Sequence, residues 1–200
     1  MAWYRLRNAP APWGDYGRML VSGMATRAED CVLEVERVGP FVPPIDMWSS
    51  EDAPIVTDAF RRSIEASGLR GACYREVRKA RVVRIDWRGW NRTSGRPERL
   101  PSGAHPDSYV TGGEHDPALA TEMGPLWEIY AEEAPEETDA DFARAPGYHC
   151  LAESGVVVSD RAQKWLATHA AEWIRTQRLD PKPGHHRRLL SELRRRLEGD

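Results

Sequence analysis

The sequence predicts an α+β fold, with a mixed or antiparallel sheet flanked by two N-capped helices. Two segments carry this prediction, because a β-branched run leads into a hydroxyl residue, an aspartate and a helical pattern at residues 54–60 and again at residues 156–162. The hydroxyl groups of Thr57 and Ser159 are placed to accept hydrogen bonds from unpaired amides of the first helical turn, and the following aspartates lie at the positive end of the helix dipole. Residues 81–87 alternate apolar and polar side chains, as a strand with one solvated face does.

Length and composition favour a single domain. The chain has 200 residues, which is enough to bury a core without metals or disulfides. We expect residues 1–180 to form one α+β domain, and residues 181–200 to form a Pro/Gly hinge and an arginine-rich C-terminal helix. The formal charge of −3 hides an uneven distribution, so local charge blocks say more about partners than the net charge does.

Cysteine usage and hydropathy indicate a cytoplasmic protein. Cys31, Cys73 and Cys150 are far apart and lack CxxC spacing, which is typical of buried thiols in a reducing compartment. No stretch approaches the roughly 20 apolar residues that cross a bilayer, and residues 1–7 lack the apolar centre of a secretory signal. We therefore expect no membrane partner.

Further strands are expected outside the two capped segments. Residues 3–6 form a short initial strand in this interpretation, a Pro/Gly-rich loop continues through Gly17, and a strand lies near residues 31–38. Residues 73–77 are predicted to be another strand. From residue 89 to 117 the composition is rich in Gly, Pro, Ser, Asn, His and Asp, which predicts an irregular connection.

Both helices have an apolar face. The first is expected from Asp58 to Ser67, with Phe60 and Ile64 four residues apart on one side, and with Gly68 placed to end it in a left-handed conformation. The second has the longer pattern, whose apolar positions follow helical spacing: Ala162, Trp165, Leu166, His169, Ala170, Trp173 and Ile174.

The two strand-to-helix segments raise the question of an internal duplication. The matched positions are few, and a hydroxyl cap after a β-branched strand is common in unrelated folds. On the sequence alone, cap chemistry accounts for the match and convergence is favoured over duplication.

The histidines do not predict a metal or a cofactor. The six histidines include the pair His185 and His186, but no H-E-x-x-H, C-x-x-C or H-x-x-x-H spacing is present. His169 lies on the apolar face of its predicted helix, where a core histidine with a backbone partner is expected. No catalytic, cofactor-binding or metal-binding residue is assigned.

A thiol enzyme is an alternative interpretation. Its nucleophile would be Cys150, which needs a histidine base and a lowered pKa. His149 is adjacent in sequence, so on a strand the two side chains would point to opposite faces. The sequence also lacks a glycine-rich phosphate loop and a G-x-S-x-G elbow.

An acidic block is the stronger candidate for function. Residues 128–141 contain seven carboxylates and no basic residue, and such a block can steer and occupy a cationic protein surface. A solvated loop that maintains solubility is the alternative. The candidate partner-binding residues are Glu128, Glu132, Glu133, Glu136, Glu137, Asp139 and Asp141.

The C-terminal stretch has the opposite charge. A helix predicted from His185 to Leu197 places leucines on one side, Leu189, Leu190, Leu193 and Leu197, and arginines elsewhere. A nucleic-acid-associated regulator using this helix is conceivable, but aromatic stacking residues and a DNA-binding motif are missing. A helix that docks on its own domain or on a partner is preferred, because long arginine stems can cover apolar surface.

The order of these elements resembles bacterial immunity proteins of polymorphic toxin systems, in particular the Imm11 group, also called DUF1629. The resemblance rests on residues 53–60, on residues 68–71 leading into residues 74–77, and on residues 157–162 with the helix that contains Trp165. Together they cover about a third of the chain. A related group carries paired CxxCG motifs, which this sequence does not have.

The resemblance implies a non-enzymatic antitoxin that binds a cognate toxin inside the producing cell and blocks its active site or substrate path. It transfers no functional residue from a motif, because families of this kind diversify on the binding surface. The acidic block is therefore a separate physical hypothesis for the toxin-facing surface, and it would suit a cationic nuclease, whose phosphate-binding surface depends on Lys and Arg.

Overall fold

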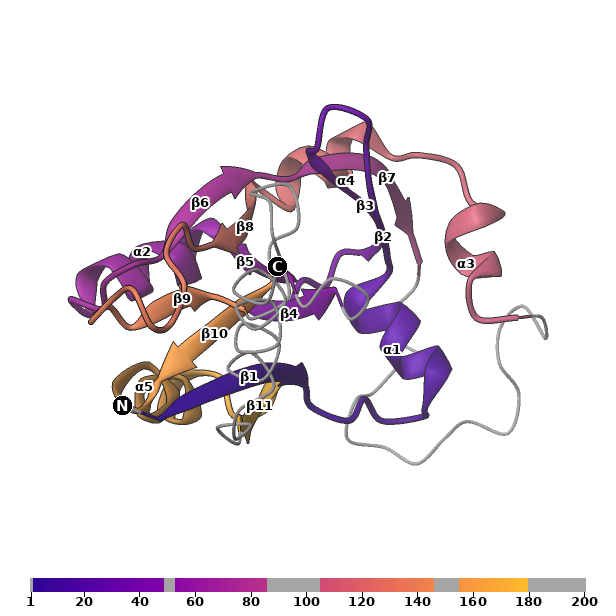
Figure 1. The fold of residues 1–200 in the computed structure, drawn as a ribbon. Helices are drawn as coiled ribbons and strands as arrows, with labels where there is room; N and C mark the ends of the chain where they lie inside the picture. The colour runs from indigo at the N-terminus through magenta and orange to yellow at the C-terminus, as the bar shows by residue number, and fades with distance from the viewer. Residues whose placement is uncertain (1, 49–52, 86–104, 146–154, 180–200) are drawn as a thin grey trace, which may run out of the picture.

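Three β-sheets make up the framework of the protein (Figure 1). The computed structural model describes residues 2–48, 53–85, 105–145 and 155–179. Sheet A has the strand order β11 (Ile174–Arg178), β1 (Trp3–Asn8), β10 (Val156–Ser159) and β9 (Phe142–Arg144). Sheet C has the order β4 (Ile45–Trp48), β5 (Ala53–Thr57), β8 (Leu126–Tyr130) and β6 (Cys73–Glu76). Sheet B has the order β2 (Met24–Arg27), β3 (Leu33–Gly39) and β7 (Arg78–Arg84).

The α+β class predicted from the sequence is confirmed. Sheets A and C are antiparallel, whereas sheet B is mixed because β3 and β7 run parallel. The described helices are α1 (Asp15–Ser22), α2 (Asp58–Ala66), α3 (Ser108–Thr111), α4 (Pro117–Glu122) and α5 (Asp160–His169). The division into three sheets was not predicted.

Both predicted helix caps are present. The backbone N–H of Phe60 donates to the hydroxyl of Thr57 at 3.3 Å, and that of Ala162 donates to the hydroxyl of Ser159 at 3.2 Å. Gly68 follows α2 with φ +72°, a left-handed conformation that glycine adopts without a steric penalty. The start of each helix therefore follows from cap chemistry, as predicted.

Several sequence predictions are wrong in detail. The expected loop through Gly17 contains the start of α1, whose apolar residues Tyr16, Met19 and Leu20 pack against the core of the sheet B region. Two short helices, α3 and α4, lie within the stretch expected to be irregular. In β7 both Val82 and Val83 are buried, so this strand does not have one solvated face.

The second capped helix is shorter than its pattern predicted. It ends at His169, and Ile174 lies instead at the start of β11. Turn hydrogen bonds from Trp173 and Ile174 to the carbonyl of Ala170 link the two elements. His169 is exposed rather than in the core, and its ring stacks on Trp165 with 4.2 Å between centroids.

Some predictions lie outside the described residues. These concern the end of the strand predicted at residues 81–87, most of the connection from residue 89 onward, the pair His149 and Cys150, and residues 180–200.

Sheets A and C have the same topology, which the sequence did not reveal. In sheet C, α2 connects β5 to β6 with β8 between them, and in sheet A, α5 connects β10 to β11 with β1 between them. The fourth strand, β4 or β9, precedes and pairs with β5 or β10. Each sheet is thus a split β-α-β unit with one additional edge strand.

The equivalence holds residue by residue. Thr57 pairs with Leu126 and Arg75 pairs with Glu128, while the corresponding Ser159 pairs with Trp3 and Gln177 pairs with Arg5. The separation in sequence from Thr57 to Arg75 equals that from Ser159 to Gln177, so no insertion interrupts the match.

Side-chain contacts repeat as well. The Trp127 ring N–H donates to the carboxylate of Asp58 at 3.1 Å, and the Tyr4 hydroxyl donates to that of Asp160 at 2.9 Å. Each bond links the middle strand of a sheet to the first residue of its helix. Agreement in topology, register and contacts goes beyond cap chemistry and favours an internal duplication, which reverses the preference drawn from the sequence.

The two copies have exchanged their first strands. Along the chain, β1 precedes β4, β5, α2 and β6, whereas β8 precedes β9, β10, α5 and β11. In space, β1 is the middle strand of the sheet that contains β10, and β8 is the middle strand of the sheet that contains β5. Each sheet therefore needs a strand from the other half of the chain.

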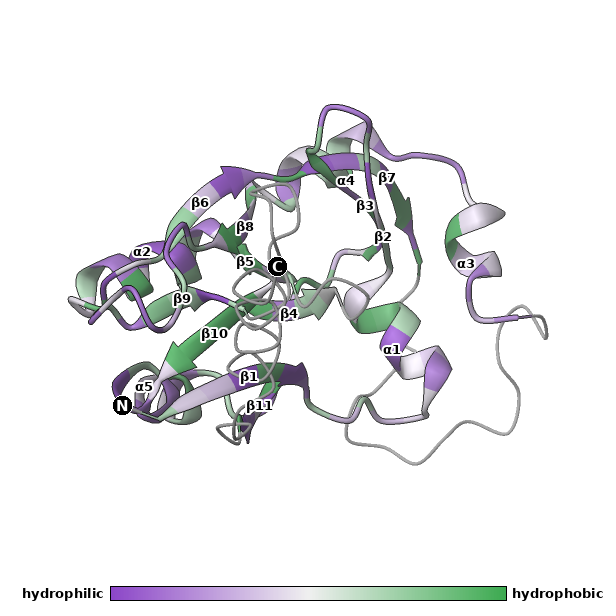
Figure 2. Ribbon diagram, viewed as in Figure 1, coloured by the Kyte–Doolittle hydropathy of each residue, from purple (hydrophilic) through white to green (hydrophobic). Residues whose placement is uncertain are grey.

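One core unites the two sheets. Leu6, Val56, Ile129 and Val158 belong to a single buried cluster, together with residues of α2 and α5, and Figure 2 shows the hydrophobic character of β10 within it. The Asn8 side chain bonds to the backbone of Met47 through a donor and an acceptor, each at 2.8 Å, and so joins β1 to β4 as a strand partner would.

The third sheet covers one face of sheet C. Leu33 and Val35 of β3 share a buried cluster with Ile55, Leu126 and Val77, all of which lie on the side of sheet C that faces away from α2. We call this the outer face of sheet C. Helices α1 and α3 complete the region around sheet B (Figure 1), which is inserted between β1 and β4 and between β6 and β8.

The two caps should differ in their effect on stability. Thr57→Ala removes one cap bond and is expected to lower the free energy of unfolding by about 1 kcal/mol. Ser159→Ala also removes the bond that the Ser159 hydroxyl donates to the buried carboxylate of Asp141 at 2.8 Å, which adds about 1–3 kcal/mol. Urea unfolding of both variants measures the difference, and equal losses would contradict this assignment.

Candidate partner-binding surface

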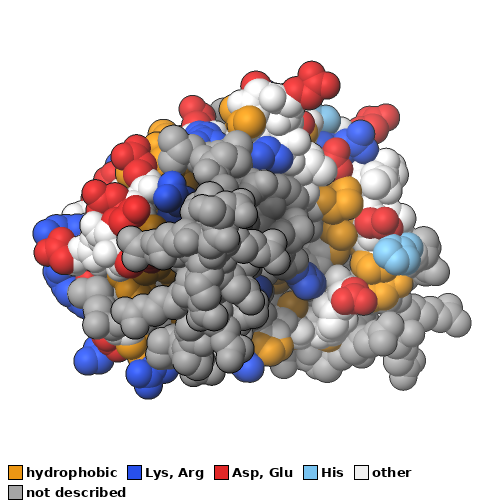
Figure 3. Space-filling view, viewed as in Figure 1, with side chains coloured by type: hydrophobic (Ala, Val, Ile, Leu, Met, Phe, Trp, Pro, Cys, Tyr) orange, Lys and Arg blue, Asp and Glu red, His pale blue; other side chains and the backbone are white. Residues whose placement is uncertain are grey.

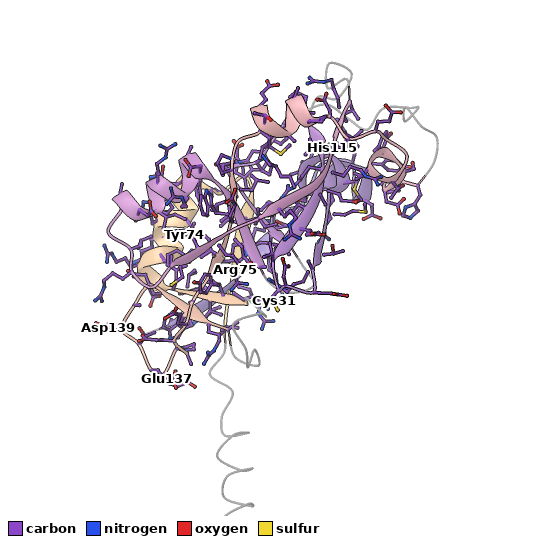
Figure 4. All side chains as sticks on the ribbon, turned by 90° about the horizontal axis from the view of Figure 1, so that it is seen from above. Cys31, Tyr74, Arg75, His115, Glu137 and Asp139 are labelled. Atoms are coloured by element: carbon purple, nitrogen blue, oxygen red, sulfur yellow. The ribbon has the colours of Figure 1, made fainter. Side chains whose placement is uncertain are left out.

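The acidic block forms the connection between β8 and β9. Because β8 belongs to sheet C and β9 to sheet A, this connection carries the chain from one sheet to the other. Figure 3 shows acidic side chains on the side of the molecule that carries α2 and β9, and Figure 4 shows Glu137 and Asp139 at the margin of the molecule. Five of its carboxylates are exposed: Glu132, Glu133, Glu136, Glu137 and Asp139.

The first residue of the block is buried. The Glu128 side chain is fully inaccessible, and its Oε1 lies 2.6 Å from Nη2 of Arg27 on β2. Its Oε2 lies 3.9 Å from Nη1 of Arg75 on β6. Alternation along β8 places Glu128 on the outer face of sheet C, where the sheet B region covers it. This carboxylate therefore holds two sheets together.

The last residue of the block is buried too. Asp141 is 4% exposed and accepts hydrogen bonds from the Ser159 hydroxyl at 2.8 Å, from the Arg70 backbone N–H at 3.1 Å and from the Arg161 guanidinium at 3.2 Å. The prediction that Glu128 and Asp141 face a partner is wrong, because both carboxylates are buried and bonded to residues of the protein itself. A partner-binding role for the other five stays a prediction.

Several bonds fix the path of the connection. The backbone N–H of Arg144 donates to the carbonyl of Glu133 at 2.7 Å, and that of Ala134 donates to the Glu137 carboxylate at 3.1 Å. Arg70 pairs with Asp139 at 3.1 Å, although both side chains are largely exposed, so this pair contributes little to stability. Five carboxylates are thus presented from a connection whose two ends are anchored.

A buried ion pair lies at the edge of a cavity. Arg37 and Asp46 are both about 95% buried, with 2.6 Å between Nη1 and Oδ2. Burial raises the pKa of Asp46, and the attraction of Arg37 opposes this effect. Asp46 lines a cavity of about 290 Å³, which lies between the segment after β1, helix α1 and the turn that contains Trp173. Like Glu128, Asp46 connects sheet C to a strand of sheet B.

A second hollow contains a lysine and a histidine. The Lys79 ammonium donates to the carbonyls of Ala120 and Gly124, and its pKa is lowered by burial. The His115 ring accepts a hydrogen bond through Nδ1 from the backbone N–H of Val82 at 3.0 Å. Both side chains therefore hold backbone groups around α4 and β7, and Figure 4 shows His115 far from Glu137 and Asp139.

The two described thiols lie in different surroundings. Cys31 is exposed in the turn before β3, and its carbonyl accepts hydrogen bonds from Arg27 and Arg75. Burial, with a smaller contribution from Glu132, raises the pKa of Cys73 and so disfavours its thiolate. Within the described ranges, no group of three His, Cys, Asp or Glu side chains is arranged to hold a metal ion.

Comparisons with known proteins supply no assignment: no protein-family model, curated protein or solved structure matches this chain. No helix in the described part of the chain is long and apolar enough to span a membrane. The fold and the acidic connection define an α+β protein with an exposed anionic surface between two sheets.

Sequence reasoning missed the arginines that bury the ends of the block. Arg27 and Arg75 are far from Glu128 in sequence, and no spacing signal links them. The alternation of β8 could have indicated in part that Glu128 is buried. Along this strand Glu128 shares one face with Leu126 and Tyr130, while Trp127 and Ile129 share the other.

Removing the charge of Glu128 should destabilise the protein. Glu128→Gln leaves the largely buried Arg27 without its carboxylate, which is expected to lower the free energy of unfolding by about 3–5 kcal/mol. The matched control is Glu133→Gln in the same block, which is exposed and is expected to change stability by less than about 0.5 kcal/mol. Chemical denaturation compares the two, and similar values would show that Glu128 is not a structural residue.

Proposed function

We propose that this protein is an immunity-type binding protein that neutralises a cognate toxin in the producing cell by covering a basic surface of that toxin. The observation that supports this proposal is the group of five exposed carboxylates on the β8–β9 connection, of which Asp139 forms an exposed ion pair with Arg70. The resemblance of the chain to toxin-immunity proteins supplies the class of partner.

Anchoring of the connection is what suits it to binding. The buried carboxylates of Glu128 and Asp141 anchor its ends, and a connection held at both ends has less conformational entropy to lose when a partner docks. Exposed carboxylates on such a support produce a concentrated negative potential, which accelerates association with a cationic protein. A surface of this kind competes with the phosphate groups that a nuclease binds through Lys and Arg.

The chemistry of the described side chains is consistent with binding. Burial raises the pKa of the Cys73 thiol, and the side chains of Lys79 and His115 are engaged by backbone groups. The proposal therefore assigns the protein a partner of complementary charge and no reaction of its own.

Charge removal at the connection tests the proposal. The protein is co-expressed with the toxic product of the adjacent gene, and complex formation and growth are measured. We expect a complex and restored growth, and a variant that combines Glu132→Gln, Glu133→Gln and Glu136→Gln is expected to bind roughly tenfold more weakly at low salt. This difference should shrink as salt screens the charges.

A matched control separates local from general charge effects. Glu29→Gln, Glu114→Gln and Glu122→Gln together remove the same charge from other exposed positions and should leave the affinity nearly unchanged. Absence of both a complex and growth rescue would contradict the proposed function. Equal weakening by the two triple variants would contradict the assignment of the acidic connection.

A further inference from the structure

Sheet A has an apolar patch on the side that faces away from α5, which we call the outer face of sheet A. Alternation along the strands places Ala143, Ala145 and Val157 there, and all three are at most 1% exposed. Among the described residues, the apolar side chains packed against them are Trp3 and Leu179, which flank the patch. Helix α5 covers the opposite face, where Val158 packs with Leu166.

The duplicated sheet shows what covers such a face. The equivalent positions of sheet C include Ile55, Leu126 and Val77, and the sheet B region packs on them. In that copy the chain leaves the last strand of the repeat at Val77, whose N–H donates to the carbonyl of Leu126 at 2.9 Å, and it continues directly into β7 of the covering sheet.

The second copy leaves its last strand in the same way. Leu179 corresponds to Val77, and Trp3 corresponds to Leu126. The N–H of Leu179 donates to the carbonyl of Trp3 at 2.8 Å, which is the same bond that Val77 makes to Leu126 in the first copy. The last described residue, Leu179, therefore lies on the outer face of sheet A, as Val77 lies on the outer face of sheet C.

We infer that the chain's own residues 185–197 dock on the outer face of sheet A through their leucine side. At helical spacing Leu189, Leu190, Leu193 and Leu197 form an apolar stripe, and the segment begins a few residues after Leu179. This inference does not rest on the proposed function, because it concerns an intramolecular contact.

Charge at the edge of the face fits the same occupant. Arg5 of β1 takes the position that Glu128 has in sheet C, and there the covering strand β2 supplies the opposite charge through Arg27. With the charge reversed in sheet A, a carboxylate in the covering segment would correspond to Arg27 of the sheet B region. Glu192 lies three residues after Leu189, beside the leucine stripe.

Photo-cross-linking of the full-length chain tests the inference. Trp3 and Tyr4 are neighbours on β1 that point to opposite faces of sheet A. A benzophenone amino acid is placed at Trp3 in one protein and at Tyr4 in a control, and cross-linked peptides are identified by mass spectrometry. We expect the Trp3 position to label residues 185–200 of the same chain, and the Tyr4 position to label α5.

Any other principal product from the Trp3 position overturns the inference. A product of twice the monomer mass would assign the face to a second copy, and a cross-link to a co-purified protein would assign it to a partner. A labelled peptide outside residues 185–200 would assign the face to another segment of this chain.

A leucine variant provides a second measurement that does not depend on the probe. A variant with both Leu190→Asp and Leu193→Asp should increase hydrogen exchange of residues 155–159 at least tenfold, because the patch loses its cover. Arg194→Asp together with Arg195→Asp, which lie outside the leucine stripe, should leave exchange nearly unchanged. Unaltered protection in the leucine variant would contradict the inference.

Discussion

The exchange of β1 and β8 between the two halves is the constraint on which the rest of the structure depends. Because each sheet contains a middle strand from the other half, neither half can complete its hydrogen bonds alone. The shared core and the Asn8–Met47 bonds follow from this arrangement. The exchange also explains why the chain must cross between the sheets, once after β1 and once after β8.

The two crossings differ in structure and in role. The crossing after β1 supports sheet C, whereas the crossing after β8 presents the candidate binding surface. After β1 the chain inserts α1, β2 and β3, which cover the outer face of sheet C and bury Glu128 and Asp46 against arginines. After β8 the crossing is the short acidic connection. The buried carboxylates of Glu128 and Asp141 anchor the two ends of this connection, which is the physical reason to regard it as a binding surface.

Local chemistry determined which parts of the fold could be predicted. The caps at Thr57 and Ser159, the turn at Gly68 and the fold class depend on neighbours in sequence, and they were predicted correctly. The length of α5 was wrong because Trp173 and Ile174 continue a helical spacing while lying beyond a turn. The burial of Glu128 and Asp141 depends on distant arginines and on strand exchange, and neither leaves a periodic signal in the sequence.

Native-state hydrogen exchange as a function of denaturant tests the strand exchange most directly. The account predicts that amides in the middle of β1, β5, β8 and β10 converge on one unfolding free energy and one denaturant dependence, because sheets A and C lose their middle strands together. If β1 and β10 opened in a step separate from β5 and β8, with a distinct free energy, the two sheets would be independent and the account would be contradicted.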